Sequence, residues 1–600
     1  MAACLAGLGG TISSSVCTMS LFLWLTFVFC CSGSAISGLI TQAVSSDVQY
    51  DATATPQCLA EPGCTMYQGG IIVNPEFSHG TAGWTVFGKG AIEERTSRTK
   101  NRFMVAHHRK CPLDSFSQKV RLEKGKFYAF SAWIQVNEGS ETVSVVFRTG
   151  HGMFVPGGSI VAEQGCWSLL KGGIAANSSS TVDVLFESKN TSKEIWVDNV
   201  ALQPFSKKQW RFHQDESMEK VRKSRVRFQI TYANKRGLAV RGAKFFVKQT
   251  KPGFPFGCGM NFHILESTDY QYWFASRFRF TTFTNAMKWY STEEKQGREN
   301  YTIADAMVKF AQDNCISIRG HNIFWDDPKY QPDWVKTLSP KDLRKAAEKR
   351  INSVVSRYAG ELIAWDVVNE NMHFSFFEDN LGKNASSIYY STAYKLDPTA
   401  RMFLNEYNTI EYCGDEKVSP GNYKKRLREI FSYPGNEDIP AGIGVQGHFG
   451  PGQPNLAYMR SSLEILATTG VPIWLTEVSV EPGDNQAQYL EEILREAHCH
   501  PAVEGIIMFA GPAYAGFNTT ALADMNFNNT PAGDVVDNLI KEWRTRDFEG
   551  CTDGGGFFST SLFHGDYEIT ITNPATNSTS TSTFEVTKDS SGRTFHFQIE

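Results

Sequence analysis

Between residues 254 and 543, short apolar runs alternate with longer segments of helical character. The strand candidates are residues 256–260, 279–283, 317–321, 363–368, 401–404, 442–445, 472–475 and 505–509. Eight strands alternating with helices over about 290 residues are typical of a (β/α)8 TIM barrel. Ser339 and Pro340 also predict a helix start, as N-cap and first helical residue, before residues 341–358.

Two of these runs end in a carboxylate. Residues 363–371 read IAWDVVNEN and residues 473–478 read IWLTEV, so Glu370 and Glu477 follow buried strands. A single Glu in this position more often caps a helix or pairs with Arg. Two such acids at the carboxyl ends of barrel strands instead favour paired-carboxylate chemistry, as in glycoside hydrolysis. Glu370 and Glu477 are therefore the candidate catalytic pair.

Most other strand ends carry polar or aromatic residues suited to holding a sugar. The motifs are TNAMKW at 284–289, RGHNIFW at 319–325, NEYN at 405–408 and QGH at 446–448. Together with WDVVNE and WLTEV, this ordered set closely resembles glycoside hydrolase family 10 in its plant form.

The resemblance implies an endo-1,4-β-xylanase that retains the anomeric configuration. Glu370 would be the general acid and then the general base, and Glu477 the nucleophile. Asn369 would bind the sugar 2-hydroxyl. The residues that would line the reacting sugar's subsite are His321, Trp325, Tyr407, Gln446 and His448, while Asn285 and Lys288 would hold the next sugar.

Two departures from the family pattern bear on activity. Phe509 stands where the family usually has Trp beneath the reacting sugar, and Ser479 stands where an acid usually orients the histidine that contacts the nucleophile. Two alternatives stay open beside hydrolysis. One is a transglycosylase, which the sequence does not separate from a hydrolase. The other, motivated by Phe509 and Ser479, is a weakly active or inactive protein that binds wall polysaccharide.

The segment at 69–205 has short alternating runs split by turn residues, which predict an all-β sandwich. The stretches IVNPEF at 72–77, GW at 83–84 and WVDNV at 196–200 resemble family 22 carbohydrate-binding modules. The resemblance implies a xylan-binding groove, with Tyr128, Trp133 and Glu187 as the candidate contacts.

The remaining segments complete a multidomain plan. Residues 206–250 are expected to be a charged connector with β-strands, residues 251–545 the catalytic barrel, and residues 546–600 a small β C-terminal extension with a mobile Ser/Thr-rich loop. Residues 1–35 resemble a signal peptide, because an apolar stretch of about a dozen residues is too short to span a bilayer.

Sequons at Asn177, Asn190, Asn300, Asn384, Asn518, Asn528 and Asn577 agree with export to the cell wall. The cysteines beyond residue 35 are odd in number, which leaves at least one thiol free, and Cys58–Cys64 and Cys111–Cys166 are plausible disulfides.

Composition and charge mainly exclude other classes of function. A net charge of −4 gives no case for nucleic acid, and no CxxC pair suggests zinc. No metal or other cofactor is indicated. The expected partner is xylan, arabinoxylan or glucuronoxylan, bound by a secreted monomer without stable membrane association.

Overall fold

The computed structural model describes residues 48–234 and 237–600. The expected signal peptide, at residues 1–35, lies outside this part of the chain. Within the described residues, no helix has the length and apolar content needed to cross a membrane.

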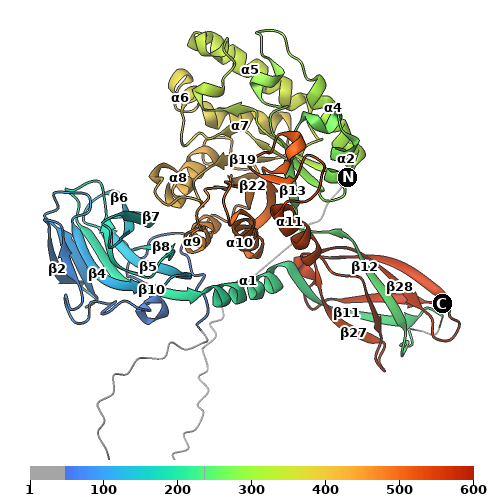
Figure 1. The fold of residues 1–600 in the computed structure, drawn as a ribbon, viewed down its shortest axis with the longest axis horizontal. Helices are drawn as coiled ribbons and strands as arrows, with labels where there is room; N and C mark the ends of the chain where they lie inside the picture. Colours follow the sequence, from blue (N-terminus) through green and yellow to red (C-terminus); the bar gives the residue numbers. More distant parts are fainter. Residues whose placement is uncertain (1–47, 235–236) are drawn as a thin grey trace, which may run out of the picture. The chain divides into compact units, whose positions relative to one another are not determined.

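The first folded segment is a sandwich of two five-stranded antiparallel sheets (Figure 1). One sheet has the order β1 (Thr85–Phe87), β4 (Ser115–Leu122), β9 (Ser180–Glu187), β6 (Ser140–Arg148) and β7 (Phe154–Glu163). The other has the order β2 (Ala91–Thr96), β3 (Arg102–His107), β10 (Ile195–Ser206), β5 (Lys126–Val136) and β8 (Ser168–Ala175). The predicted all-β sandwich is therefore present.

Strand alternation explains the sandwich core. Val143, Val145 and Phe147 lie on one side of β6 and are fully buried between the sheets. β5 is apolar on both sides, because its second face packs under the segment that precedes β1. This segment places Gly63 against the ring of Trp133.

A disulfide joins Cys58 to Cys166, and neither pairing favoured from the sequence forms. Cys64 and Cys111 are free and exposed. Spacing along the chain misled the prediction, because the sheet brings residue 166, at the β7–β8 turn, beside the segment that precedes β1. The expectation that at least one thiol stays free is confirmed.

The connector begins as a helix, α1 (Lys207–Arg222), capped by Ser206, whose side chain accepts the N–H of Gln209. Trp210 and Gln214 on this helix donate to the buried Glu496 of α10 (Gln486–Cys499), at 2.7 Å each. The helix therefore packs on the barrel rather than forming a solvated linker.

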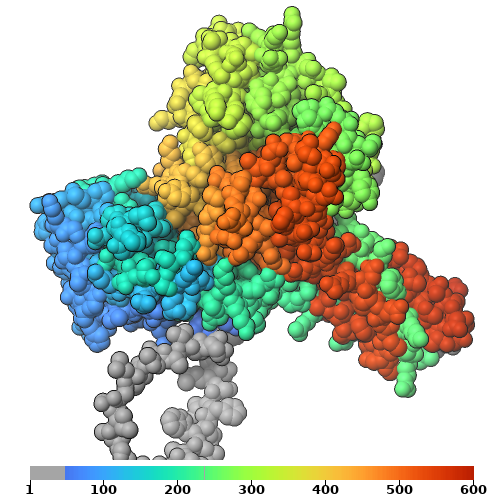
Figure 2. Space-filling model, viewed as in Figure 1, coloured from blue at the N-terminus to red at the C-terminus, as the bar shows by residue number. Residues whose placement is uncertain are grey.

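The strands that follow α1 belong with the end of the chain. β11 (Lys223–Tyr232) pairs with β27 (Phe557–Phe563) and β30 (Thr594–Ile599). β12 (Lys244–Pro252) pairs with β26 (Phe548–Cys551) and β28 (Gly565–Thr572), and β28 pairs with β29 (Thr579–Val586). Figure 2 shows the two sets, green and red, as one body.

This arrangement corrects the domain plan in two ways. The strand-bearing part of residues 206–250 and the extension at 546–600 form one module with a shared core, in which Phe228 and Phe245 pack against rings from the C-terminal strands. The Ser/Thr-rich stretch is strand β29 rather than a mobile loop. As the edge strand of its sheet, β29 pairs with β28 along residues 579–586.

The barrel has the predicted eight parallel strands, closed by the pairing of β20 with β22. They are β13 (Phe256–Met260), β14 (Phe280–Phe283), β15 (Ser317–Gly320), β17 (Ala364–Asp366), β19 (Arg401–Glu406), β20 (Ala441–Val445), β22 (Ile473–Val480) and β23 (Val503–Met508). The TIM-barrel prediction is confirmed, with strand ends within a few residues of those expected.

Helices surround these strands (Figure 1). The main ones are α2 (Thr268–Ala275), α4 (Thr302–Asp313), α5 (Pro340–Arg357), α7 (Ala385–Leu396), α8 (Pro420–Phe431), α9 (Leu456–Ala467), α10 and α11 (Pro531–Glu542). α5 starts as predicted, since Ser339 accepts the N–H of Asp342 and Pro340 is the first helical residue.

Candidate active site

Glu370 follows the short strand β18 (Val368–Asn369), where the chain turns at the carboxyl end of the barrel. The residue has a positive φ of 60°, and its N–H donates to the carbonyl of Asn405 at 3.0 Å. The side chain is held by two donors: the indole Nε1 of Trp325 at 2.7 Å and the Nε2 of Gln446 at 3.0 Å. The carboxyl is therefore fixed in one orientation.

Burial raises the pKa of Glu370 above its ordinary value. The two hydrogen bonds oppose this shift, but the negative charge of Glu477 adds to it. A carboxyl that keeps its proton near neutral pH can serve as a general acid.

Glu477 lies inside β22, one residue after Thr476, and its side chain faces a cluster of donors. Asn405 Nδ2 donates to Oε1 at 2.9 Å. His448 Nε2 lies 3.6 Å from Oε2, and His321 Nε2 lies 4.0 Å from Oε1. Burial alone raises the pKa of Glu477, yet His321, His448 and Lys288 lower it to about 2. The carboxyl is therefore ionised, as a nucleophile must be.

The two acids share one polar network. The N–H of Glu477 donates to the carbonyl of Gln446 at 2.8 Å, and the side chain of the same Gln446 reaches Glu370. Asn405 Nδ2 also donates to Oδ1 of Asn369 at 2.9 Å, which ties the residue before Glu370 to Glu477. The predicted pair is thus brought together at one end of the barrel.

His321 is held from behind by a residue that the sequence reasoning did not assign. Asp366 is fully buried in β17. Its carboxylate accepts a hydrogen bond from His321 Nδ1 at 2.9 Å and another from an Arg319 guanidinium nitrogen at 2.8 Å. The Asp366 contact points Nε2 of His321 at Glu477. Its signal was in the WDVVNE motif, where a charged residue interrupts an apolar strand.

His448 has Ser479 as its orienting partner. Nδ1 of His448 lies 2.7 Å from the Ser479 hydroxyl, a hydrogen bond that this neutral side chain makes in place of an acid. Burial lowers the pKa of His448, but the hydrogen bond and charge of Glu477 outweigh it and raise the pKa overall. The imidazole keeps 40% side-chain exposure, so it faces an open cleft.

A groove of about 750 Å³ lies beside His448, whose Nε2 is 3.6 Å from Glu477. Among its lining residues are Asn285, Lys288, His448 and Phe509, all predicted to contact substrate. Lys288 Nζ lies 4.3 Å from the centre of the Trp325 ring. Burial lowers the pKa of Lys288 to about 8, against the opposing charges of Glu477 and Glu370. We call this cavity the Asn285 groove.

Tyr407 lies near Glu370 but outside the residues that line the Asn285 groove in the described chain. Its ring stacks on His373 with centroids 3.8 Å apart and an interplanar angle of 7°. Trp325 stacks similarly on Tyr330, at 3.8 Å and 12°. His373 and Tyr330 were not identified from the sequence, because neither falls in a strand-end motif.

The candidate contacts in the sandwich require a correction. The exposed fraction is 1% for Tyr128 and 4% for Trp133, and each residue packs in a hydrophobic core. Both lie on β5, which is covered on both faces, so neither presents its ring to a ligand. Glu187 lies on the other sheet, half-buried, and burial raises the pKa of its carboxyl. The three residues do not form one groove.

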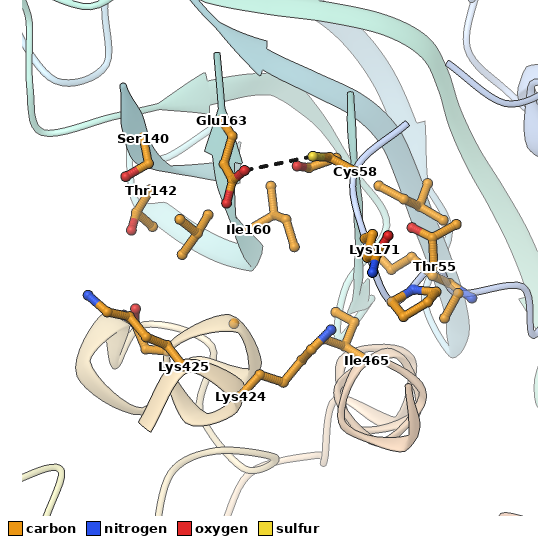
Figure 3. A pocket seen from close by; sticks show the side chains of 18 of the residues that line it. Thr55, Cys58, Ser140, Thr142, Ile160, Glu163, Lys171, Lys424, Lys425 and Ile465 are labelled. Carbon is orange, nitrogen blue, oxygen red and sulfur yellow. Dashed lines mark hydrogen bonds between the residues drawn. The ribbon is translucent and has the colours of Figure 1, made fainter. Parts of the chain in front are cut away.

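A larger cavity, about 990 Å³, lies between sandwich strands and the helices α8 and α9 (Figure 3). Lys424 and Lys425 approach it from α8, while Ser140, Thr142 and Glu163 approach from β6 and β7. At its edge Lys171 forms a buried ion pair with Glu464 of α9. Neither cavity is lined by Glu370 or Glu477 themselves, but the Asn285 groove is lined by His448, which lies 3.6 Å from Glu477.

Eight parallel strands with two oppositely tuned glutamates at their carboxyl ends define the class as a TIM-barrel glycosidase of the paired-carboxylate type. A sequence profile described as glycosyl hydrolase family 10 matches residues 247–511. The chain is 51% identical over 485 residues to "Endo-1,4-beta-xylanase 5-like" of Arabidopsis thaliana, covering 80% of this chain and 85% of that protein. "Endo-1,4-beta-xylanase 5" of the same plant is 49% identical over 518 residues, or 84% of this chain and 86% of its own. The chain belongs to glycosyl hydrolase family 10.

Two solved structures are similar to parts of this chain. Xylanase 10B from Thermotoga petrophila RKU-1 in complex with xylobiose is 24% identical, with a TM-score of 0.43, over 48% of this chain and 94% of that one. The CBM22-1–GH10 modules of Clostridium thermocellum Xyn10B, complexed with xylohexaose, are 16% identical, with a TM-score of 0.40, over 78% and 97%. The barrel assignment itself rests on the strand pairing described above.

Proposed function

We propose that this protein is a retaining endo-1,4-β-xylanase that cleaves the backbone of plant xylan. The observation that carries the proposal is the placement of Glu370 and Glu477 in one hydrogen-bonded network, whose members shift the two pKa values in opposite directions. The names of the similar Arabidopsis proteins support xylan as the substrate.

In the first step, a Glu477 carboxylate oxygen forms a bond to the anomeric carbon as the bond to the leaving oxygen breaks. Glu370 gives its proton to that oxygen, so the departing chain leaves as a neutral alcohol. Asn369, oriented by Asn405, hydrogen-bonds the 2-hydroxyl of the reacting sugar. His321 and His448 stabilise the charge of Glu477 before the attack.

In the second step, Glu370 is ionised and removes a proton from water. The water oxygen bonds to the anomeric carbon, and the bond to Glu477 breaks. Two inversions give net retention. A sugar hydroxyl in place of water gives transglycosylation by the same route.

The decisive experiment incubates the purified protein with arabinoxylan and with glucuronoxylan, and measures new reducing ends together with early anomers by proton NMR. We expect β-anomers first and complete loss of release in Glu477→Ala. α-Anomers first contradict double displacement. Binding without release by the wild type favours the inactive alternative, and transfer to a labelled xylo-oligosaccharide favours the transglycosylase.

For the sandwich, we propose xylan binding on the outer face of the sheet that contains β1 and β7. Phe154 on β7 is 44% exposed and lies edge-on to Phe87 on β1, with centroids 6.3 Å apart, and exposed rings are suitable for stacking on sugars. Affinity electrophoresis in xylan tests this with Phe154→Ala in a Glu477→Gln background. Unchanged retardation of the variant contradicts the proposal.

We further propose a secreted glycoprotein of the cell wall that acts as a monomer, with both catalytic acids from one chain. Among the sequon asparagines, Asn190 is half-buried and the other six are exposed, which allows glycan attachment. A mass decrease on enzymatic deglycosylation of protein from plant cell walls, and size-exclusion chromatography, test these points.

A further inference from the structure

His373 lies three residues after Glu370 and contacts two carboxylates at once. Its Nδ1 is 2.7 Å from Oε2 of Glu406, and its Nε2 is 2.9 Å from Oδ2 of Asp415. The flat face of the ring stacks on Tyr407. We call His373, Glu406, Tyr407 and Asp415 the His373 cluster.

The cluster is largely shielded from water. The side chains of His373, Glu406 and Asp415 are 8%, 0% and 20% exposed. Glu406 also accepts the N–H of Met372 at 2.6 Å, and Asp415 accepts Asn408 Nδ2 at 2.9 Å. Each carboxylate is therefore held in place by a second donor besides the imidazole of His373.

The partners of His373 favour its cationic form. Two ionised carboxylates offer only acceptors, so both ring nitrogens must carry a proton to satisfy them. Burial lowers the pKa of His373, but the hydrogen bonds and charges of Glu406 and Asp415 outweigh it, and the pKa is raised overall. Lys417 also approaches the cluster, with its Nζ 3.4 Å from the His373 carbonyl, and the negative charges of Glu370 and Asp327 act on Tyr407.

The cluster joins the turn that carries Glu370 to the loop that follows β19. The N–H of His373 donates to the Glu370 carbonyl at 3.2 Å, while Glu406, Tyr407 and Asp415 all belong to β19 and its loop. Tyr407 is half-exposed with one face covered by His373, so its free surface lies on the other face.

The position of Tyr407 relative to the two acids assigns it a side of the cleft. The Asn285 groove starts at His448, beside Glu477. Tyr407 instead lies beside the turn that carries Glu370, because its ring stacks on His373, whose N–H donates to the Glu370 carbonyl. This position differs from the one expected from the sequence, in the subsite of the reacting sugar. Because the general acid faces the leaving oxygen, Tyr407 is on the side of the departing sugar.

We propose that His373 is a positioning residue for the leaving-group side of the cleft. It holds the Tyr407 ring as a platform for the departing or accepting xylose unit and fixes the Glu370 turn to that platform. This inference rests on the proposed xylanase function. It adds a residue that controls the binding of the leaving or accepting sugar next to the cleaved bond.

The test compares two substrates in the full-length protein. Xylohexaose fills the leaving-group side with sugar, whereas 4-nitrophenyl β-xylobioside places only a nitrophenyl group there. For His373→Gln we expect kcat/KM to fall about tenfold or more with xylohexaose and by less than about threefold with the aryl xylobioside, since only the first substrate uses binding beyond the bond. We also expect a lower ratio of transfer to hydrolysis with xylobiose as acceptor.

Asp415→Asn provides a second variant that keeps the imidazole, the stack and Glu406. It should show the same substrate preference with a smaller loss. His151→Gln, at an exposed sandwich position, is the matched control and should leave both rates unchanged. Nitrogen-15 NMR of the wild type should show His373 protonated on both ring nitrogens.

Equal losses on both substrates, with a lower Tm, indicate a structural role only and overturn the proposal. Unchanged kinetics in both variants also overturn it, as does a neutral His373 in the NMR spectrum at neutral pH. A wild type that hydrolyses neither substrate refutes the proposed function instead, and this inference with it.

Discussion

Glu370 and Glu477 have the same side chain but different environments. Indole and amide donors contact the first, and two histidines and a lysine surround the second. The neighbours of each glutamate, and not the residue type, therefore decide which one acts as the general acid and which as the nucleophile. Rescue of alanine variants by azide can distinguish these two roles.

Glu370→Ala should lose about 10³-fold or more of its activity on xylan, because general acid catalysis is absent. Azide should restore turnover of an aryl xylobioside with a good leaving group and give a β-glycosyl azide. Glu477→Ala with azide should give the α-azide. Product NMR distinguishes the two, and exchanged anomers would reverse the assignment.

The pH dependence of kcat/KM should be bell-shaped. Glu477 must be ionised, and its pKa near 2 places the acidic limb below the ordinary range of Glu. Glu370 must be protonated, and its raised pKa places the basic limb above that range. Glu370→Gln should remove the basic limb in the glycosylation of activated aryl xylosides. A basic limb that persists unchanged in this variant assigns it to another group.

Ser479 offers a test of how His448 is held. Ser479→Asp places a carboxylate against Nδ1 and should raise the pKa of His448 by about one unit, or about 1.4 kcal/mol in favour of the imidazolium. Ser479→Asn is the neutral control and should leave the pKa of His448 within about a few tenths of a unit of the wild-type value. Proton NMR titration of the His448 ring measures both. If the pKa of His448 is identical in the two variants, the charge of the residue at position 479 does not control the protonation of His448.

At the scale of elements, the Cys58–Cys166 bridge fastens the segment before β1 to the β7–β8 turn. Replacing both cysteines by Ser should lower the free energy of unfolding of the sandwich by about 2–4 kcal/mol. Cys111→Ser, an exposed free thiol of the same sandwich, is the control and should have no effect.

Thermal unfolding with and without reductant measures this difference. Reductant should lower the Tm of the wild type and leave the double variant unchanged. A wild type insensitive to reductant, with an accessible bridge confirmed by mass spectrometry, would show that the disulfide adds no stability. Xylanase activity should persist in either case, because neither cysteine lies near Glu370 or Glu477.

At the scale of the whole molecule, the chain leaves one β-module at Pro252, builds the barrel, and returns to complete the same module from Phe548 onward. β11 and β12 pair mainly with strands more than three hundred residues away, so we expect neither part of this module to fold alone. The two ends of the barrel segment therefore meet in this module.

Neighbouring phenylalanines on β12 test this topology. Phe245 is 3% exposed in the shared core, and Phe246 is 40% exposed on the opposite face. Phe245→Ala should cost about 3–5 kcal/mol and Phe246→Ala below about 1 kcal/mol. Hydrogen exchange should show lost amide protection in β28 and β30 only for Phe245→Ala. Protection lost in β12 alone contradicts a single module.

The sequence by itself determined the barrel and the position of two glutamates at its carboxyl end. Strand and helix alternation is a local property, and the carboxyl ends of parallel barrel strands necessarily meet, so Glu370, Glu477 and most strand-end contacts followed from their positions. Ser339 and Pro340 likewise placed the start of α5 from purely local rules.

Only the tertiary structure decided what depends on distant pairing. Tyr128 and Trp133 are buried because the segment before β1 covers β5, and Cys166 meets Cys58 because the sheet brings them together. The module shared by the two flanks of the barrel and the contacts of His373 arise in the same way. Such contacts join residues far apart in the chain, and no local periodicity encodes which distant segment will cover a given face.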